Sequence, residues 1–336
     1  MPQSADLKLI FKLLSQSSSL SVVSDFLKSK KLTHSAGSWE DMYKLRIEPG
    51  LNNGQITLSE LLALLQSSEE YGRQHVFLYR TTTQKASDLM NRDRISKILA
   101  TLELTDLLIT PRTFEFPPQP SFVDVRWHTQ KTDTDFILKE VETRESREYK
   151  DTTEEGTSII KRYERVFDRG VNIIHLKRSG DLEIRLQSRS GTSRYSDDLK
   201  RLEHRIKPFL TLSEFAPVPL LKAKTALWTE RAKLSGKVRY SELHIKNDDN
   251  ISLRVSADAV SVNVAGSQPA ETSVNSFLDS AGYCGGSNVW FIKGETVPAR
   301  DVHVVVSGEV NEFAVPTNCS EMDYEYVSAE IKALNT

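Results

Sequence analysis

The sequence predicts an α+β fold in three parts. An N-terminal helical bundle is expected over residues 1–72, a central domain of mixed or antiparallel sheet with helices over 73–212, and a C-terminal β-rich domain that ends in a helix over 213–336. Three observations indicate this division. Apolar residues recur at helical spacing through the first 70 residues, alternation with a period of two residues becomes frequent from residue 121 onward, and four prolines interrupt the chain within 110–120.

The N-terminal part is expected to contain four short helices. Leu7, Ile10 and Leu14 recur at helical spacing, which predicts the first of them. Thr57 is followed three residues later by Glu60, a capping-box pattern that predicts the start of the last one. The second helix is expected over 20–31, the third from a cap at Ser38 to Arg46 with a stop at Pro49–Gly50, and the fourth over 57–70.

The clearest hairpin of the chain lies in the central part. Two strands, over 171–178 and 181–188, flank a tight turn at 179–180. Alternation along the second strand predicts that its leucine and isoleucine side chains face the core, whereas Glu183 and Arg185 face outward. Further strands are expected over 75–80, 122–128 and 135–143, helices over 93–104 and 196–209, and a charged, solvated loop over 145–155.

The remaining segments alternate between expected strands and helices. Within the strand over 122–128, Val123, Val125 and Trp127 are expected to share one face. Residues 158–167 fit either a helix or a strand. The C-terminal part is expected to hold strands over 243–245, 251–255, 260–264, 289–292, 302–306 and 312–315, helices over 220–234 and 273–280, and a last helix from a cap at Asn318 to Leu334.

Charge is sorted along the chain. The 336 residues carry a net charge of −2, and 38% of them are hydrophobic, which is typical of a globular protein. Residues 1–120 carry +1, residues 121–240 carry +6 and residues 241–336 carry −9. This asymmetry suggests an anionic partner for the basic part, although the basic and acidic parts could also pair with each other or form a mixed surface.

No catalytic or cofactor motif is found. The seven histidines are scattered singly, Cys284 and Cys319 form no CxxC pair, and no Walker A, GxGxxG or GxSxG motif occurs. We therefore expect no metal, no cofactor and no disulfide. No apolar run reaches the roughly 20 residues that span a membrane, and no signal peptide is evident, so we expect a cytoplasmic protein without membrane contact.

A metal-dependent nuclease or other hydrolase is the enzymatic alternative. Asp124, Asp135 and Glu142 lie on two neighbouring expected strands, and carboxylates that converge at the end of a sheet can hold Mg²⁺ and activate water. The spacing fits poorly, because Ile137 stands where an acidic residue would usually precede Lys139. An exposed, salt-bridged hairpin is the competing interpretation.

Nucleic-acid binding has the strongest support in the residue pattern. Residues 169–207 contain ten lysines and arginines, and the loop from Arg189 to Arg194 offers guanidinium, hydroxyl and backbone donors without a carboxylate. Such donors suit phosphate oxygens. The residues expected to contact nucleic acid are Lys28, Lys30, Lys31, Arg126, Lys177, Arg178, Arg185, Arg189, Arg194, Lys200 and Arg201.

The segment Phe26–Ile47 resembles a SAP-type motif, in which a helix ends in a basic leucine turn and a small-residue loop leads to a capped second helix. SAP modules bind DNA through the basic turn and the N-terminal end of the second helix. The resemblance therefore implies DNA contacts from Lys28, Lys30 and Lys31. Residues 39–41, Trp-Glu-Asp, replace the basic opening that is usual in the second helix.

The order of elements in the first 190 residues is similar to that in the centromere protein N family of kinetochore proteins. In both, a small death-fold-like helical head precedes a strand and then a mixed sheet domain that opens with an aromatic-rich strand, here 75–80 and 122–128. The resemblance implies a DNA- or chromatin-type scaffold. Such a scaffold binds through basic residues and pairs with a partner through its C-terminal half.

These observations favour a non-enzymatic nucleic-acid-binding adapter or scaffold. In this hypothesis the head and the basic central part contact phosphates, and the acidic C-terminal part docks a protein partner or a second copy of the chain. Besides the hydrolase, a third hypothesis is a pure protein–protein scaffold in which the head is a homotypic interaction module.

Overall fold

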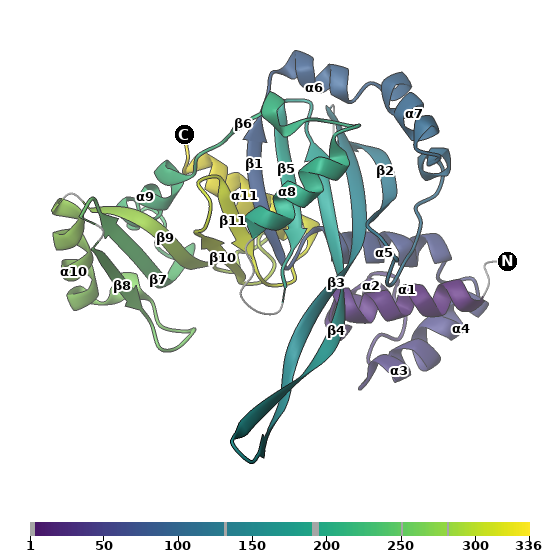
Figure 1. The fold of residues 1–336 in the computed structure, drawn as a ribbon, viewed down its shortest axis with the longest axis horizontal. Helices are drawn as coiled ribbons and strands as arrows, with labels where there is room; N and C mark the ends of the chain where they lie inside the picture. Colours follow the sequence, from purple (N-terminus) through teal and green to yellow (C-terminus); the bar gives the residue numbers. More distant parts are fainter. Residues whose placement is uncertain (1–3, 131–132, 190–194, 250, 281) are drawn as a thin grey trace.

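One antiparallel sheet connects the central and C-terminal parts of the chain (Figure 1). The computed structural model describes residues 4–130, 133–189, 195–249, 251–280 and 282–336. In sheet order the strands are β2 (Ser121–Gln130), β3 (Asp133–Glu155), β4 (Ser158–Leu176), β5 (Asp181–Gln187), β1 (Gln74–Arg80), β11 (Glu312–Val315), β10 (Val302–Val306), β9 (Gly282–Phe291), β7 (Val238–Asn247) and β8 (Ser252–Ser256), and β6 (Ala216–Pro217) pairs with β1. Together with the helices that pack on it, this sheet confirms the predicted α+β fold.

Strand β1 joins the two halves of the sheet. On one side Phe77 lies opposite Ile184 of β5, and on the other side Val76 lies opposite Phe313 of β11. Strands from before and after residue 212 thus belong to one continuous hydrogen-bonded sheet, although the sequence predicts a boundary between the central and C-terminal domains at that residue.

Helices cover both faces of the central sheet. Phe77 of β1 packs in one core with α6 (Thr83–Leu89), α7 (Arg92–Thr101) and α8 (Tyr195–Ile206). Its neighbours Val76 and Leu78 point the other way, into a core with α9 (Leu221–Thr229), α10 (Gln268–Asp279) and α11 (Glu321–Ala333). Helix α6 is absent from the sequence prediction. Figure 1 shows α8 lying across the strands of the central sheet.

The head is a bundle with its own core. Its helices are α1 (Ser4–Ser17), α2 (Leu20–Ser29), α3 (Trp39–Met42), α4 (Glu48–Asn52) and α5 (Leu58–Glu70), and a π-helical turn (Tyr43–Ile47) links α3 to α4. Thr57 and Glu60 form the predicted capping box. The predicted stop at Pro49 is wrong, because the backbone stays helical from the π-helical turn into α4, with Pro49 in the first turn of α4.

Strands β3 and β4 extend beyond the sheet as a two-stranded arm, defined here as residues 144–169 (Figure 1). Pairing continues from Arg144 opposite Asp168 to Glu155 opposite Ser158. The loop predicted over 145–155 is therefore wrong, and the ambiguous segment 158–167 is a strand. Most side chains of the arm are exposed, so its sequence lacks the apolar alternation that marks a half-buried strand.

Burial on both sides of the sheet changes two predicted side-chain orientations. Glu183 and Arg185 were expected to face outward, yet they are 0% and 1% exposed because α11 covers their face of β5. Val123 leaves the face that Val125 and Trp127 share, because a β-bulge interrupts β2 beside it.

Two C-terminal predictions are also corrected. No strand forms over 260–264, where the chain makes turns before a 3₁₀ helix at Val264–Gly266. The last helix begins after Ser320 instead of Asn318, because Ser320 and Asp323 form a reciprocal capping box.

Candidate nucleic-acid interface

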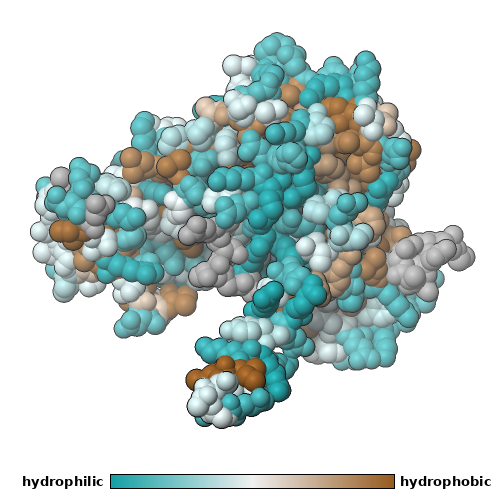
Figure 2. Space-filling view, viewed as in Figure 1, coloured by the Kyte–Doolittle hydropathy of each residue, from teal (hydrophilic) through white to brown (hydrophobic). Residues whose placement is uncertain are grey.

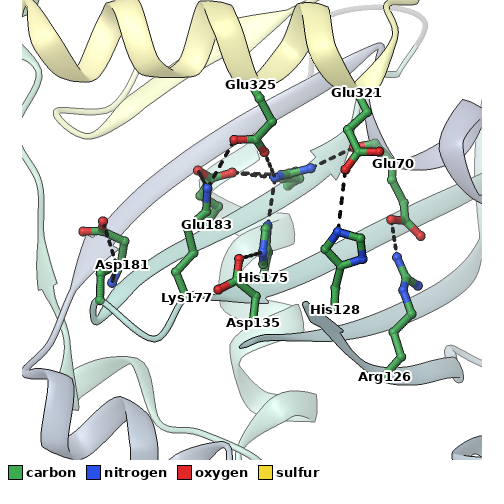
Figure 3. A network of polar contacts seen from close by, with 12 residues as sticks. Glu70, Arg126, His128, Asp135, His175, Lys177, Asp181, Glu183, Glu321 and Glu325 are labelled. Carbon is green, nitrogen blue, oxygen red and sulfur yellow. Dashed lines mark hydrogen bonds and ion pairs between the residues drawn. The ribbon is translucent and has the colours of Figure 1, made fainter. Parts of the chain in front are cut away.

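A buried polar network lies between the central strands and α11 (Figure 3). Arg185 donates from Nε and Nη2 to Glu183 Oε2 at 3.1 and 2.7 Å, and its Nη2 lies 3.0 Å from Nδ1 of His175. Nε2 of His175 lies 2.9 Å from Oδ2 of Asp135. All four side chains are buried, so the network is shielded from water.

The C-terminal helix completes this network. The hydroxyl of Tyr324 donates to Glu183 at 2.9 Å, and Nζ of Lys332 lies 2.6 Å from the same carboxylate. Burial alone would raise the pKa of Glu183, but the charges of Lys332 and Arg185 hold it well below its usual range. The network therefore fastens α11 to β5 with charged hydrogen bonds.

The basic central part and the acidic C-terminal part pair with each other at this helix. Lys177 lies 3.3 Å from Glu325, and Arg185 lies 3.7 Å from the same carboxylate. Arg185 was expected at the nucleic-acid interface, but its burial removes it from any surface. Arg126, another expected contact, is engaged by Glu70 at 2.5 Å.

The three carboxylates of the hydrolase hypothesis do not converge. Asp135 accepts a hydrogen bond from His175, whereas Glu142, an odd number of residues along β3, points to the opposite face and pairs with Arg144. Asp124 pairs with Arg126, two residues further along β2. Within the described ranges, no group of three or more histidine, cysteine, aspartate or glutamate side chains could hold a metal ion. The structure gives a hydrolase site at these positions no support.

Four arginines line a cleft at the foot of the arm, between the head and the ends of the central strands. We call it the arginine cleft. Its volume is about 280 Å³, and the lining holds four arginines but one carboxylate, Asp168. The lining residues are Leu13, Gln16, Ser17, Arg73, Phe116, Arg144, Phe167, Asp168, Arg169, Gln187, Ser188 and Arg189.

Three of these arginines are held in position by carboxylates. Arg144 pairs with Glu142, Arg169 with Glu69, and Arg189 with Asp198. Each carboxylate is shared with a second cation, so none of them neutralises its arginine alone. The ion pairs fix the guanidinium groups at the cleft without balancing all of their charge.

Two donors of the cleft have no partner in the described part of the chain. Nε of Arg189 and Oγ of Ser188 are buried there and make no hydrogen bond. Burial, reinforced by the charge of Arg144, lowers the pKa of Arg189, so its cation is incompletely compensated. An unpaired buried donor costs about 1–3 kcal/mol.

Arg73 is the exposed cation of the cleft. It forms no ion pair with any residue that the structure describes. Its φ of +54° is left-handed, which is uncommon for a residue other than glycine. Its N–H donates to the carbonyl of Thr317 at 3.2 Å, and its own carbonyl accepts from the N–H of Ser188 at 2.6 Å. Backbone strain held in this way is a recurrent feature of functional sites.

The other expected contacts are dispersed over the molecule. Lys28, Lys31, Arg178 and Lys200 are exposed, whereas Lys30 and Arg201 pair with Glu60 and Asp198. Arg194 lies outside the described residues. Arg178 stands in the turn before β5 and Arg189 follows the other end of that strand, so the expected residues do not form one surface.

Three of the four cleft arginines were missed by the sequence. Arg144 lies in the segment 144–169, where acidic and basic residues are equally frequent, and Arg169 opens the basic stretch 169–207 but was not among the expected contacts. Arg73 lies two residues before the predicted strand 75–80, and no other feature of its surroundings in the sequence marks it. The pairing of β3 with β4 brings the first two together across the arm.

Comparison of the chain with protein-family models, curated proteins and solved structures gives no match. The resemblances to SAP modules and to the centromere protein N family therefore stay predictions. Among the helices in the described part of the chain, none is both long enough and apolar enough to cross a bilayer.

Proposed function

We propose that the protein is a non-enzymatic nucleic-acid-binding adapter that holds phosphate groups in the arginine cleft. The observation that carries this proposal is a cleft lined by four arginines and one carboxylate, in which Arg73 is exposed without an ion pair in the described part of the chain and Oγ of Ser188 and Nε of Arg189 make no hydrogen bond there. A phosphate offers several oxygens that accept charged hydrogen bonds at once, and arginine is suited to them by geometry. Phosphate and sugar contacts also make up at least half of the hydrogen bonds between proteins and DNA.

Two features favour a phosphate polymer over a small anion. Phe116 and Phe167 line the cleft beside the arginines and are partly exposed, so they offer apolar surface to a sugar or a base. The cleft also lies at the foot of the arm, and Phe167 belongs to both. A ligand longer than one phosphate could continue from the cleft along the arm.

The adapter function also requires a protein partner, which we assign to the C-terminal part. Residues 241–336 carry a net charge of −9. Asp248 and Asp249 remain exposed near the turn between β7 and β8, and Ile251 is exposed beside them. Acidic and apolar side chains in one place suit a basic protein surface.

The test compares two asparagine substitutions. Arg73 and Lys31 are exposed cations with left-handed backbone, at φ +54° and +60°, and asparagine tolerates that conformation while removing the charge. We expect Arg73→Asn to weaken binding of a labelled mixed-sequence oligonucleotide about tenfold or more, because a hydrogen bond to a charged group contributes about 1.5–3 kcal/mol. Lys31→Asn should change the affinity less than about twofold. Fluorescence anisotropy between about 50 and 200 mM salt measures both.

Three results would contradict the proposal. Absence of binding at the lowest salt concentration would remove its basis, because phosphate contacts are strongest there. A larger loss for Lys31→Asn than for Arg73→Asn would place the phosphates on the head. Magnesium-dependent cleavage of plasmid that disappears in Asp124→Ala and Glu142→Ala would favour the hydrolase hypothesis.

A further inference from the structure

The arm is the largest feature of the fold that the arginine cleft leaves unexplained. β3 pairs with β4 from Arg144 to Glu155, which is twelve residues, or about 40 Å at roughly 3.3 Å per residue. Figure 1 shows the two strands projecting away from the sheet, and Figure 2 shows hydrophobic surface on the arm. Ile159 and Ile160 of β4 are exposed. Its exposed side chains leave the arm open to a ligand or a partner.

The two faces of the arm differ in chemistry. Residues that lie opposite each other in an antiparallel pair share a face, as do alternate residues along a strand. Tyr149 lies opposite Tyr163, and their ring centroids are 6.0 Å apart. We call this side the aromatic face, which consists of Arg147, Tyr149 and Thr152 of β3, of Ile159, Lys161, Tyr163, Arg165 and Phe167 of β4, and of two carboxylates, Glu145 opposite Phe167 and Glu154 opposite Ile159. The other face is acidic, with Glu148 opposite Glu164 and Asp151 opposite Arg162.

Two cations of the aromatic face are available to a ligand. Arg147 and Lys161 are exposed and have no ion-pair partner among the residues described in the structure. Arg165 pairs with Glu145 at 2.6 Å, and its guanidinium carbon lies 5.3 Å from the ring centroid of Phe167. Cations and aromatic rings thus alternate along β4 on one side of the arm.

The aromatic face leads into the arginine cleft. Phe167 belongs to this face and also lines the cleft. Arg169, two residues further along β4, points to the same side and pairs with Glu69 of the head. One ligand can therefore contact the cleft and the arm without crossing to the acidic face.

We infer that the ligand of this combined surface is a single-stranded nucleic acid, which runs from the arginine cleft onto the aromatic face of the arm. This inference rests on the proposed function. Tyr149, Tyr163 and Phe167 are 57%, 55% and 46% exposed, so their rings are free to stack on unpaired bases. The bases of a duplex are stacked inside the helix and offer only their edges in the grooves. Arg147 and Lys161 complement the phosphates between successive bases.

The length of the arm sets the size of the site. Ile159 and Phe167 are eight residues apart on β4, which is about 27 Å at roughly 3.4 Å per residue. A stacked strand advances about 3.4 Å per nucleotide. The aromatic face can therefore hold at most about eight nucleotides, within the range of about 4–16 nucleotides that single-strand-binding modules cover.

The test removes the rings and keeps the ribbon. In Tyr149→Thr/Tyr163→Thr the β-branched threonines favour the strand conformation. Val166→Thr is the control on the acidic face, where Val166 lies opposite Ser146. Full-length proteins are compared by fluorescence anisotropy on a 20-nucleotide single strand and on a hairpin duplex. We expect the tyrosine variant to bind the single strand about tenfold more weakly or worse, to bind the duplex as the unchanged protein does, and the control to match the unchanged protein on both.

The outcomes separate this inference from the proposed function. If the unchanged protein binds neither ligand, the proposed function fails and the inference fails with it. If it binds but the tyrosine variant retains full affinity for the single strand, or loses the single strand and the duplex equally, the inference alone is overturned. Sedimentation could show that the unchanged protein and the control are oligomeric and that the tyrosine variant is monomeric. In that case the aromatic face is a contact between copies of the chain, and the inference is again overturned. Lys161→Gln gives a second variant outside the aromatic pair, and it should lower the salt dependence of single-strand binding by about one phosphate contact.

Discussion

Arg185→Met should destabilise the protein by about 3 kcal/mol without weakening nucleic-acid binding. Removing one partner of a buried ion pair costs about 3–5 kcal/mol, because the other charge is left uncompensated. Here Glu183 keeps Lys332 at 2.6 Å and the hydroxyl of Tyr324 at 2.9 Å, which places the expected loss at the lower end. Methionine can fill the space beside the Tyr324 ring, whose centroid lies 4.2 Å from the guanidinium carbon.

Urea unfolding followed by tryptophan fluorescence measures this loss. The matched control is Arg201→Met, because the Arg201 side chain is 57% exposed and its pair with Asp198 should contribute less than about 1 kcal/mol. Adding Glu183→Gln to Arg185→Met should recover part of the stability, since it removes the uncompensated charge. A loss below about 1 kcal/mol for Arg185→Met, or a weaker affinity for nucleic acid in the folded variant, would refute the structural role of this network.

Two further predictions concern titrating groups. Burial raises the pKa of the Cys284 thiol to about 11 and that of the Cys319 thiol to about 12. The stability that these neutral thiols contribute is therefore present below the ordinary thiol pKa of about 8.5 and is lost as the pH rises through 11 and 12. Iodoacetamide at pH 8 should label neither cysteine until urea unfolds the chain, which mass spectrometry can check. Burial opposes ionisation of Glu183 and Glu69, but neighbouring cations lower the pKa of both carboxyl groups. The stability that these carboxylates contribute is therefore present above the ordinary glutamate pKa of about 4.3 and is lost as the pH falls through the folded pKa values. The urea midpoint should decrease between about pH 5 and pH 3, and a midpoint that does not change with pH would contradict the paired state of these carboxylates.

Local signals in the sequence identify many elements but not their arrangement. The capping box at Thr57 and the hairpin around residues 179–180 are encoded within a few residues, and both are confirmed. The placement of β1 between β5 and β11 depends on pairing with residues far along the chain, which no local pattern contains. The sequence predicts a loop over residues 145–155 instead of a strand, because the exposed strands of the arm need no alternating apolar side chains. Charged residues are therefore as suitable there as in a loop.

The candidate site shows the same limit. Arg189 was expected at the interface from its donor-rich surroundings, and it lines the arginine cleft. Arg185 lies four residues earlier, on β5, and carries the same charge, but α11 buries it, and that helix lies far away in the sequence. Tertiary packing therefore decides whether an arginine of this chain contacts a ligand at the surface or forms a buried ion pair, and local charge density cannot distinguish the two.

The central place of β1 has a consequence for synthesis of the protein. β1 is made early, yet one of its edges is completed only by β11, where Val76 meets Phe313. Until the ribosome has delivered that last strand, the growing chain carries an uncapped β edge that bears Val76 and Leu78, both buried in the finished protein. Such an edge is a template for wrong pairing, and closing it through distant contacts is slow. Fragments that end before residue 312 should therefore aggregate or require a chaperone.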